Sequence, residues 1–272
     1  MARPVIALLT DFGTADHYVG AMKGVMLGIC PDAALVDVTH DVSPHDVLEG
    51  ALELEACRRA FPAGTVFLAV VDPGVGSSRR GLAAASGEYR FVAPDNAILT
   101  AVFREEPPSR VAELSDRRFA RPVISRTFEG RDRFAPAAAW LASGVDVAAM
   151  GPSAENLVTI DIPSPVVEDG MVAGEVLRID RFGNAVTNIR RADWVRAAKA
   201  GGVEIGIGDW RTSRVVETYA ELAAGEAGVL FGSRDVLEVS ARETSAARIL
   251  GVGRGARVVV TWVEQGRDRD GL

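Results

Sequence analysis

Three short polar runs interrupt an otherwise aliphatic chain, and each places a carboxylate in a turn after an apolar segment. They are residues 10–13, 71–76 and 180–184. In an open α/β sheet, ligands bind at the carboxyl ends of the strands, and polar loops on a rigid scaffold usually carry the chemistry. The carboxylates Asp11, Asp72 and Asp180 are therefore the first candidates for functional residues.

Each candidate also has a purely structural interpretation. Asp11 could hold a diol, or it could cap the helix that follows it. Asp72 begins an Asp-Pro-Gly sequence, which favours a turn whatever its function. Arg79 stands seven residues beyond Asp72, after a glycine-containing stretch, and could fold back to pair with it. Three polar residues farther along the chain could simply stabilise a turn: Asn184, Thr187 and Asn188.

Other kinds of catalytic site are poorly supported. The histidines are His17, His40 and His45, and they show no spacing typical of a metal site. Cys30 and Cys57 lack a CxxC spacing, and this absence favours reduced, buried thiols. The chain has no GxxxxGK[ST] loop, no GxGxxG after a strand and no GxSxG elbow.

Composition narrows the class of protein. The 272 residues are 48% hydrophobic and 25% charged, which is ordinary for a globular chain. The net charge of −7 argues against nucleic acid as a partner. The sequence shows neither a signal peptide nor an 18-residue apolar span, so we expect a cytoplasmic protein without a membrane anchor.

Strands and helices alternate through the first part of the chain. We expect strands at 5–9, 34–39, 65–71, 82–85 and 90–92, and helices at 16–29, 46–59, 98–104 and 134–142. This alternation predicts an α/β domain with a mostly parallel central sheet flanked by helices.

The pattern changes near Gly151. Residues 151–165 are punctuated by prolines and are interpreted as a linker. Beyond them we expect short strands at 171–179, 203–207, 213–216, 236–239 and 257–262, with one helix at 192–200. Short strands separated by glycine-rich turns favour a small barrel or sandwich. We therefore expect two domains, an α/β sheet domain at 1–162 and an all-β barrel at 163–272.

Taken together, these runs resemble the S-adenosyl-L-methionine (SAM) hydroxide adenosyltransferase family, whose members are SAM hydrolases related to the SAM-dependent fluorinase and chlorinase. The similarity spans nearly the whole chain. The ordered matches are residues 10–13, 20–24, 30–32, 37–40, 71–76 with Arg79, 93–96, 127–128 with 130–132, and 182–188.

The resemblance implies a fold, an assembly and a reaction. It implies a homotrimer in which each active site lies between the N-terminal domain of one subunit and the C-terminal domain of its neighbour. Water or hydroxide would attack the ribose C5′ of SAM and release L-methionine and adenosine. No metal and no additional cofactor are implied.

The resemblance also implies roles for individual residues. Asp72 and Arg79 match two members of the family's Asp-Arg-His triad, and Asp11 matches the carboxylate that holds the ribose hydroxyls. Asn184 would read the adenine, and Tyr219 would stack on it. The remaining substrate-binding residues are Phe182, the pair Asp16 and Asp180 near the ammonium of the methionine moiety, and the pair Ser233 and Arg234 at its carboxylate.

The chain departs from the family at two positions. Glu129 stands where the triad usually has histidine; it could act as a base, or pair with Arg79 and weaken that residue's help to hydroxide. Ala97 stands where glycine often follows Pro-Asp-Asn. We expect hydrolase activity to survive both changes, although the first keeps open a catalytically weak protein that binds SAM or adenosine.

A halogenase is the other alternative. The fluorinase has tyrosine at the position of Asp72 and serine at that of Gly130, and it carries an insertion that residues 79–91 are too few to contain. The chlorinase also has tyrosine at the Asp72 position. A carboxylate there would repel halide and tolerate water, so hydrolysis is favoured.

Overall fold

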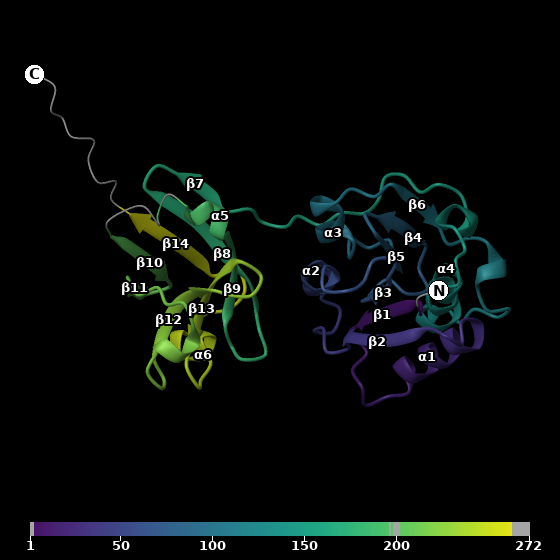
Figure 1. Cartoon of the computed structure of the whole chain (residues 1–272), viewed down its shortest axis with the longest axis horizontal. Coiled ribbons are helices and arrows are strands. Elements are labelled where there is room, and N and C mark those ends of the chain that lie inside the picture. Colours follow the sequence, from purple (N-terminus) through teal and green to yellow (C-terminus); the bar gives the residue numbers. More distant parts are fainter. Residues whose placement is uncertain (1–2, 196, 198–201, 263–272) are drawn as a thin grey trace, which may run out of the picture. The chain divides into compact units, whose positions relative to one another are not determined.

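The computed structural model describes residues 3–195, 197 and 202–262 (Figure 1). Contacts within the chain divide it into two compact units, Met1–Ile162 and Pro163–Leu272, called the N-unit and the C-unit below. Each unit has its own hydrophobic core. No helix among the described residues combines the length and apolarity needed to cross a bilayer.

The N-unit is built on a mixed six-stranded sheet with the order β2-β1-β3-β5-β4-β6. Its strands are β1 (Val5–Thr10), β2 (Ala34–Thr39), β3 (Val66–Val70), β4 (Gly81–Ser86), β5 (Tyr89–Pro94) and β6 (Arg110–Glu113). The pairs β1–β2, β1–β3 and β3–β5 are parallel, whereas β4 runs antiparallel to both β5 and β6. All five residues of β3 are buried, as expected for a central strand covered on both faces.

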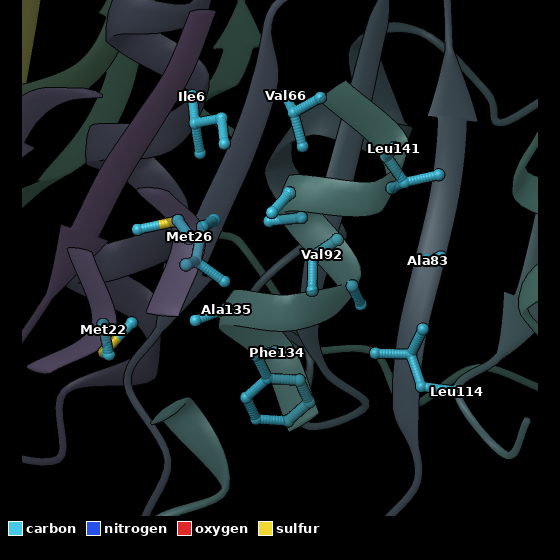
Figure 2. Close-up of a cluster of buried hydrophobic side chains, with 14 of the residues drawn as sticks. Ile6, Met22, Met26, Val66, Ala83, Val92, Leu114, Phe134, Ala135 and Leu141 are labelled. Carbon is cyan, nitrogen blue, oxygen red and sulfur yellow. The ribbon is translucent and has the colours of Figure 1, made fainter. Parts of the chain in front are cut away.

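Helices cover both faces of this sheet. Its four α-helices are α1 (Tyr18–Ile29), α2 (Val47–Arg58), α3 (Thr100–Glu105) and α4 (Ala135–Ala142). Alternate β1 residues divide between two cores: Ile6 packs in the cluster containing α1 and α4 residues, and Ala7 in the cluster beside α2 and α3. Figure 2 shows the first cluster, in which Ile6 and Val66 from the sheet gather with Met26 of α1 and Leu141 of α4.

The topology explains why the polar runs lie at one edge. Thr10 at the end of β1 is paired in register with Val70 at the end of β3. Asp11 and Asp72 follow these two residues by one and two positions. Parallel neighbours therefore deliver both carboxylates to the same carboxyl edge of the sheet.

Every helix and strand predicted for the N-unit is present, with ends within two residues of the expected ones. The short edge strand β6 was not predicted. The proline-punctuated stretch is not a free linker over its whole length, because its first part is bonded to the N-unit. There, Ala154 N donates to Val111 O, Val158 N to Asp95 Oδ1, and Ile160 N to Thr100 Oγ1.

The C-unit contains an eight-stranded antiparallel sheet with the order β11-β10-β14-β8-β9-β13-β12, and β7 pairs with β8. The strands are β7 (Val166–Glu168), β8 (Met171–Ile179), β9 (Ala185–Arg190), β10 (Val203–Ile207), β11 (Trp210–Thr212), β12 (Ala227–Phe231), β13 (Val236–Ala241) and β14 (Arg257–Trp262). The first part of β8 pairs with β14 and its last part with β9. This shared long strand makes the sheet barrel-like, although no ladder between β11 and β12 closes it in the described residues.

The C-unit differs from the sequence prediction in several places. The strand expected at 213–216 is wrong: β11 ends at Thr212, and Val215 makes only an isolated bridge. The strands β7, β9 and β12 and the helix α6 (Ala246–Leu250) were not predicted. The helix expected at 192–200 appears as α5 (Arg191–Trp194), and residues 196 and 198–200 lie outside the described residues.

Candidate active site

Asp11 is fixed between the loops that follow β1 and β2. Its Oδ2 accepts a hydrogen bond from the backbone N–H of His45 at 2.9 Å, and its side chain is 8% exposed. His45 adopts a left-handed backbone with φ 68°, which aims its N–H at the carboxylate. Asp11 does not cap α1, whose N-cap residue is His17. The structural interpretation of Asp11 as a cap is therefore wrong.

A hydrogen-bonded chain through the buried side chains of Thr10 and His40 to the exposed Asp37 holds the loop that carries Asp11. His40 Nδ1 lies 2.8 Å from Thr10 Oγ1, and its Nε2 lies 2.9 Å from Asp37 Oδ1. The carbonyl of His40 also accepts from Gly13 N at 2.8 Å. Since Phe12 N donates to Thr10 Oγ1, side chain and backbone together fix the turn at the end of β1.

Asp72, Arg79 and Glu129 form one cluster. Arg79 Nε donates to both oxygens of Asp72 at 3.0 Å, and Arg79 Nη2 lies 2.8 Å from Glu129 Oε2. The three side chains are between 4% and 10% exposed. The fold-back of Arg79 onto Asp72, expected from the intervening glycines, is present.

The loop between β3 and β4 achieves this fold-back through a chain of short turns. Ser77 N and its hydroxyl both donate to Gly74 O, and Arg79 N donates to Ser77 Oγ. Gly76 has φ 77°, and a Cβ there would overlap the carbonyl oxygen of Arg126. Only glycine allows this close approach, and Arg126 Nη2 completes it by donating to Gly76 O at 3.0 Å.

The cluster determines the charge state of Arg79. Burial would lower the pKa of the guanidinium, but the hydrogen bonds to Asp72 and the negative charges of Asp72 and Glu129 outweigh burial and raise its pKa above the ordinary value. The ring of Phe134 also lies 5.0 Å from Arg79 Cζ. Arg79 is thus a permanent, well-oriented cation between two carboxylates.

Aromatic side chains lie next to these acids. Phe12, Tyr18 and Phe128 pack edge to face, with ring centroids 5.2–6.2 Å apart. Gly130 faces the ring of Phe12, and a Cβ there would lie 3.5 Å from it. Asp16 is exposed on the turn before α1. Phe128 is buried, whereas Tyr18 and Asp16 are exposed, so only part of this group reaches the surface of the N-unit.

The Pro-Asp-Asn run has a structural task beside this cluster. Arg80 pairs with Asp95, and Arg80 Nη2 also donates to the carbonyls of Glu155 and Asn156. Asn96 Nδ2 donates to Val71 O, next to Asp72, at 2.8 Å. Ala97 follows with φ 82° and is buried.

All six C-unit residues predicted from the sequence line one cavity of about 840 Å³. They are Asp180, Phe182, Asn184, Tyr219, Ser233 and Arg234. They come from the β8–β9 turn, the β12–β13 turn and the short 3-10 helix Tyr219–Glu221. Phe182 is 78% exposed, whereas Asn184 is buried.

The β8–β9 turn is ordered by Asp180 itself. Its Oδ1 accepts from the backbone N–H of Phe182 and Asn184, and its Oδ2 accepts from Asn184 Nδ2 at 2.8 Å. Gly183 has φ 86° and packs so closely on Ser245 that a Cβ would collide with it. Asp180 therefore orders the turn through these three hydrogen bonds. The bond from Asn184 Nδ2 also fixes the orientation of the Asn184 amide, and with it the direction of Asn184 Oδ1.

Two polar residues after this turn have structural partners. Thr187 Oγ1 donates to Leu237 O at 2.8 Å. Asn188 Oδ1 accepts from Glu175 N, and its Nδ2 donates to Pro163 O. These bonds tie β9 to its neighbouring segments, so Thr187 and Asn188 have structural partners but lie within a strand rather than in the turn expected from the sequence.

Sequence reasoning missed three acids that line this cavity, Glu217, Glu238 and Glu243, and of these only Glu238 of β13 is buried. It is 7% exposed, and its Oε2 accepts a hydrogen bond from the Tyr219 hydroxyl at 3.2 Å. Burial raises the pKa of Glu238, and burial together with the charge of Glu238 raises the pKa of Tyr219 to about 12. The signal in the sequence that could have drawn attention to Glu238 is the presence of a glutamate within the mostly apolar run 236–241.

The fold and this geometry define a class of protein: an α/β unit with a guanidinium held between buried carboxylates, followed by a barrel-like unit with a polar and aromatic cavity. Residues 6–151 match the N-terminal domain of the SAM hydroxide adenosyltransferases, and residues 174–259 match their C-terminal domain. The chain belongs to the SAM hydroxide adenosyltransferase family.

Individual relatives agree with this assignment. A Thermus thermophilus protein named (R)-S-adenosyl-L-methionine hydrolase is 38% identical over 264 residues, which cover 94% of this chain and 98% of the relative. A fluorinase from an Actinoplanes species is 34% identical over 71% of this chain and 74% of its own. A crystal structure of an uncharacterized conserved protein from Thermotoga maritima matches with a TM-score of 0.89 and 34% identity, covering 94% and 99% of the two chains.

Proposed function

We propose that this protein hydrolyses S-adenosyl-L-methionine to adenosine and L-methionine. The observation that carries the proposal is the cluster in which Arg79 joins Asp72 and Glu129 with little exposure to solvent. Membership of the SAM hydroxide adenosyltransferase family and the hydrolase name of the Thermus thermophilus relative support the same reaction.

The chemistry requires an oriented nucleophile more than an acid. A sulfonium is already a good leaving group, so the electron pair of the C5′–S bond can pass to sulfur and leave methionine as a neutral thioether. Arg79 stabilises negative charge that develops on the attacking water, and Asp72 orients that water and accepts its proton. Glu129, in place of histidine, is a second proton acceptor beside the same guanidinium.

Substrate binding divides between the two units. In the N-unit, Asp11 holds the ribose hydroxyls, and Asp16 lies toward the ammonium of the methionine moiety. In the C-unit cavity, the bond from Asn184 Nδ2 to Asp180 directs Oδ1 to accept from the exocyclic amine of adenine, while Tyr219 and Phe182 supply aromatic contact. Arg234 with Ser233 pairs with the methionine carboxylate, and Asp180 adds charge opposite its ammonium.

The assembly belongs to the same proposal. Since the ribose and nucleophile groups lie in the N-unit and the base-reading groups in the C-unit, we infer a homotrimer in which neighbouring subunits each supply half of a site. A stable monomer with full activity in light scattering would contradict this arrangement.

Halogenation is the second candidate, and the fluorinase relative is the observation that favours it. The carboxylates of Asp72 and Glu129, both within reach of Arg79, disfavour a halide at this place because like charges repel. Reaction in excess chloride separates the two: a 5′-chloro-5′-deoxyadenosine product would support the halogenase.

The direct test is incubation of purified protein with SAM and detection of adenosine and methionine by chromatography. We expect Asp72→Ala to lower the rate by about 100-fold or more, because it removes the group that orients and deprotonates water. Asp116→Ala is the matched control, since Asp116 pairs with Arg118 on an exposed loop. If the native chain binds SAM tightly in calorimetry but yields no adenosine, the protein is a SAM-binding module rather than a hydrolase.

A further inference from the structure

We propose that Arg133 is a positioning residue for Glu129, whose carboxylate it shares with Arg79. Glutamate can then occupy the third triad position without drawing Arg79 away from Asp72. This inference rests on the proposed function for its catalytic consequence, but its structural part can be tested without substrate.

The geometry places Glu129 between two guanidinium groups. Glu129 is the N-cap residue of the π-helix Gly130–Phe134, and Arg133 follows it by four residues on this element. Glu129 Oε2 lies 2.8 Å from Arg79 Nη2 and 3.5 Å from Arg133 Nε. The side chain of Arg133 is 28% exposed, so it joins the buried cluster to its rim.

Charge balance gives the reason for this arrangement. Asp72, Arg79 and Glu129 alone would leave one negative charge in excess at side chains that are at most 10% exposed. An uncompensated buried charge is strongly unfavourable. Arg133 brings the local sum of the four ionised groups to zero. A neutral histidine at position 129 would need no such partner.

Other contacts hold Arg133 in place. Its Nη1 donates to Leu114 O at 2.9 Å. Its Cδ packs beside Gly81, where an added Cβ would lie 3.2 Å from it. Neither Arg133 Nε nor Glu129 Oε2 makes a hydrogen bond of good geometry with a described residue. The two groups therefore interact by charge.

The first experiment is a double-mutant cycle on thermal stability at neutral pH. Arg133→Gln removes the charge, and its shorter side chain also gives up the bond to Leu114 O, which is a loss common to both backgrounds. We expect it to lower the melting temperature by about 2–4 °C more in the native background than in the Glu129→His background. Arg133→Lys keeps a positive charge and should recover most of the loss.

The second experiment is the pH dependence of kcat/KM for adenosine formation. Removing a cation beside Glu129 makes its ionisation harder, so Arg133→Gln should move the acidic limb upward by up to about one pH unit, and Arg133→Lys should restore it. Arg118→Gln, which removes an arginine from an exposed pair with Asp116, should leave the limb in place.

The outcomes separate this inference from the function on which it builds. If Arg133→Gln lowers the melting temperature equally in both backgrounds, or if the acidic limb does not move, Arg133 acts only through Leu114 and the inference is wrong. If the coupling in stability is found but the native chain forms no adenosine, the proposed hydrolysis fails while the pairing of Arg133 with Glu129 stands.

Discussion

Glu238 shows how one buried carboxyl group can control the acid–base behaviour of a cavity. It packs against Gly232, where a Cβ would collide with its carboxylate, and it accepts from Tyr219. From the sequence, a glutamate between Leu237 and Val239 indicates the solvent side of a half-buried strand. The structure instead buries both faces of this part of β13, so periodicity alone could not reveal the residue.

The contact between Glu238 and Tyr219 predicts a change in the pH titration of the Tyr219 absorbance. Glu238→Gln removes a negative charge next to the phenol, so the pKa of Tyr219 should fall from about 12 toward its ordinary value of 10.0. Titration of tyrosinate absorbance measures the change, with Tyr219→Phe identifying this phenol among the three tyrosines. An unchanged titration in Glu238→Gln would show that burial alone sets the value.

The Asp72–Arg79 pair illustrates what residue-level reasoning could predict. Its two members lie in one loop, and the glycines between them allow a fold-back that sequence spacing suggests. The contact of Arg79 with Glu129 joins residues 50 positions apart in the chain. Spacing gives no such information, and only the resemblance to the family placed Glu129 in the same group.

At the scale of elements, Asp132 holds the loop before the π-helix. Its carboxylate accepts from Arg131, Arg121 and the backbone N–H of Ser125 and is fully buried. Burial would raise its pKa, but these bonds outweigh burial and lower the pKa from 3.8 to about 2. Asp132 therefore stabilises the folded state above pH 4, and this contribution is lost as the pH falls through about 4 to 2.

This linkage predicts an acid-labile N-unit. The free energy of unfolding should fall by about 2 kcal/mol between pH 4 and 2 because of this one group. Asp132→Asn should be less stable than the native chain at neutral pH and should lose less over the acid range. Thermal melts at several pH values measure both, and parallel curves for the two proteins would contradict the assignment.

The turn before α3 carries a backbone strain that a single substitution should relieve. Ala97 has φ 82°, a conformation that glycine adopts without the steric cost of a Cβ. We expect Ala97→Gly to stabilise the protein by about 0.5–1 kcal/mol in denaturant unfolding. Ala101→Gly, the same change inside α3, should destabilise it by a similar amount. A loss of stability in both variants would show that φ does not limit position 97.

Predictability from sequence differed between the two units for a physical reason. The inner N-unit strands β1 and β3 are buried on both faces, and the N-unit strands alternate with helices, so these apolar runs are easily recognised. In the C-unit, β9 contains Thr187 and Asn188, whose side chains bond to backbone inside the unit rather than to solvent. Such a strand lacks a clean alternation. The strand expected at 213–216 begins directly after the last residue of β11, Thr212.

For the whole molecule, the proposed shared site predicts complementation between inactive variants. Asp72→Ala removes an N-unit group, and Asn184→Ala removes a C-unit group. If each site draws its halves from two neighbouring subunits, co-refolding equal amounts should restore about a quarter of native activity. Co-refolding the double variant with Asp72→Ala is the control and should restore none. Activity that never exceeds the sum of the separate variants would exclude a site shared between subunits.

The contact between Gly76 and Arg126 has a consequence for how the protein acquires its reactive centre. A side chain at position 76 would collide with the Arg126 carbonyl oxygen, so Gly76 is what allows these two segments to pack directly on each other. Their 50-residue separation makes this contact non-local, so a long loop must close before it can form. A chain that ends before Arg126 would carry Asp72 and Arg79 without the segment that packs on their loop, and it would also lack Glu129 and the C-unit that the proposed site requires.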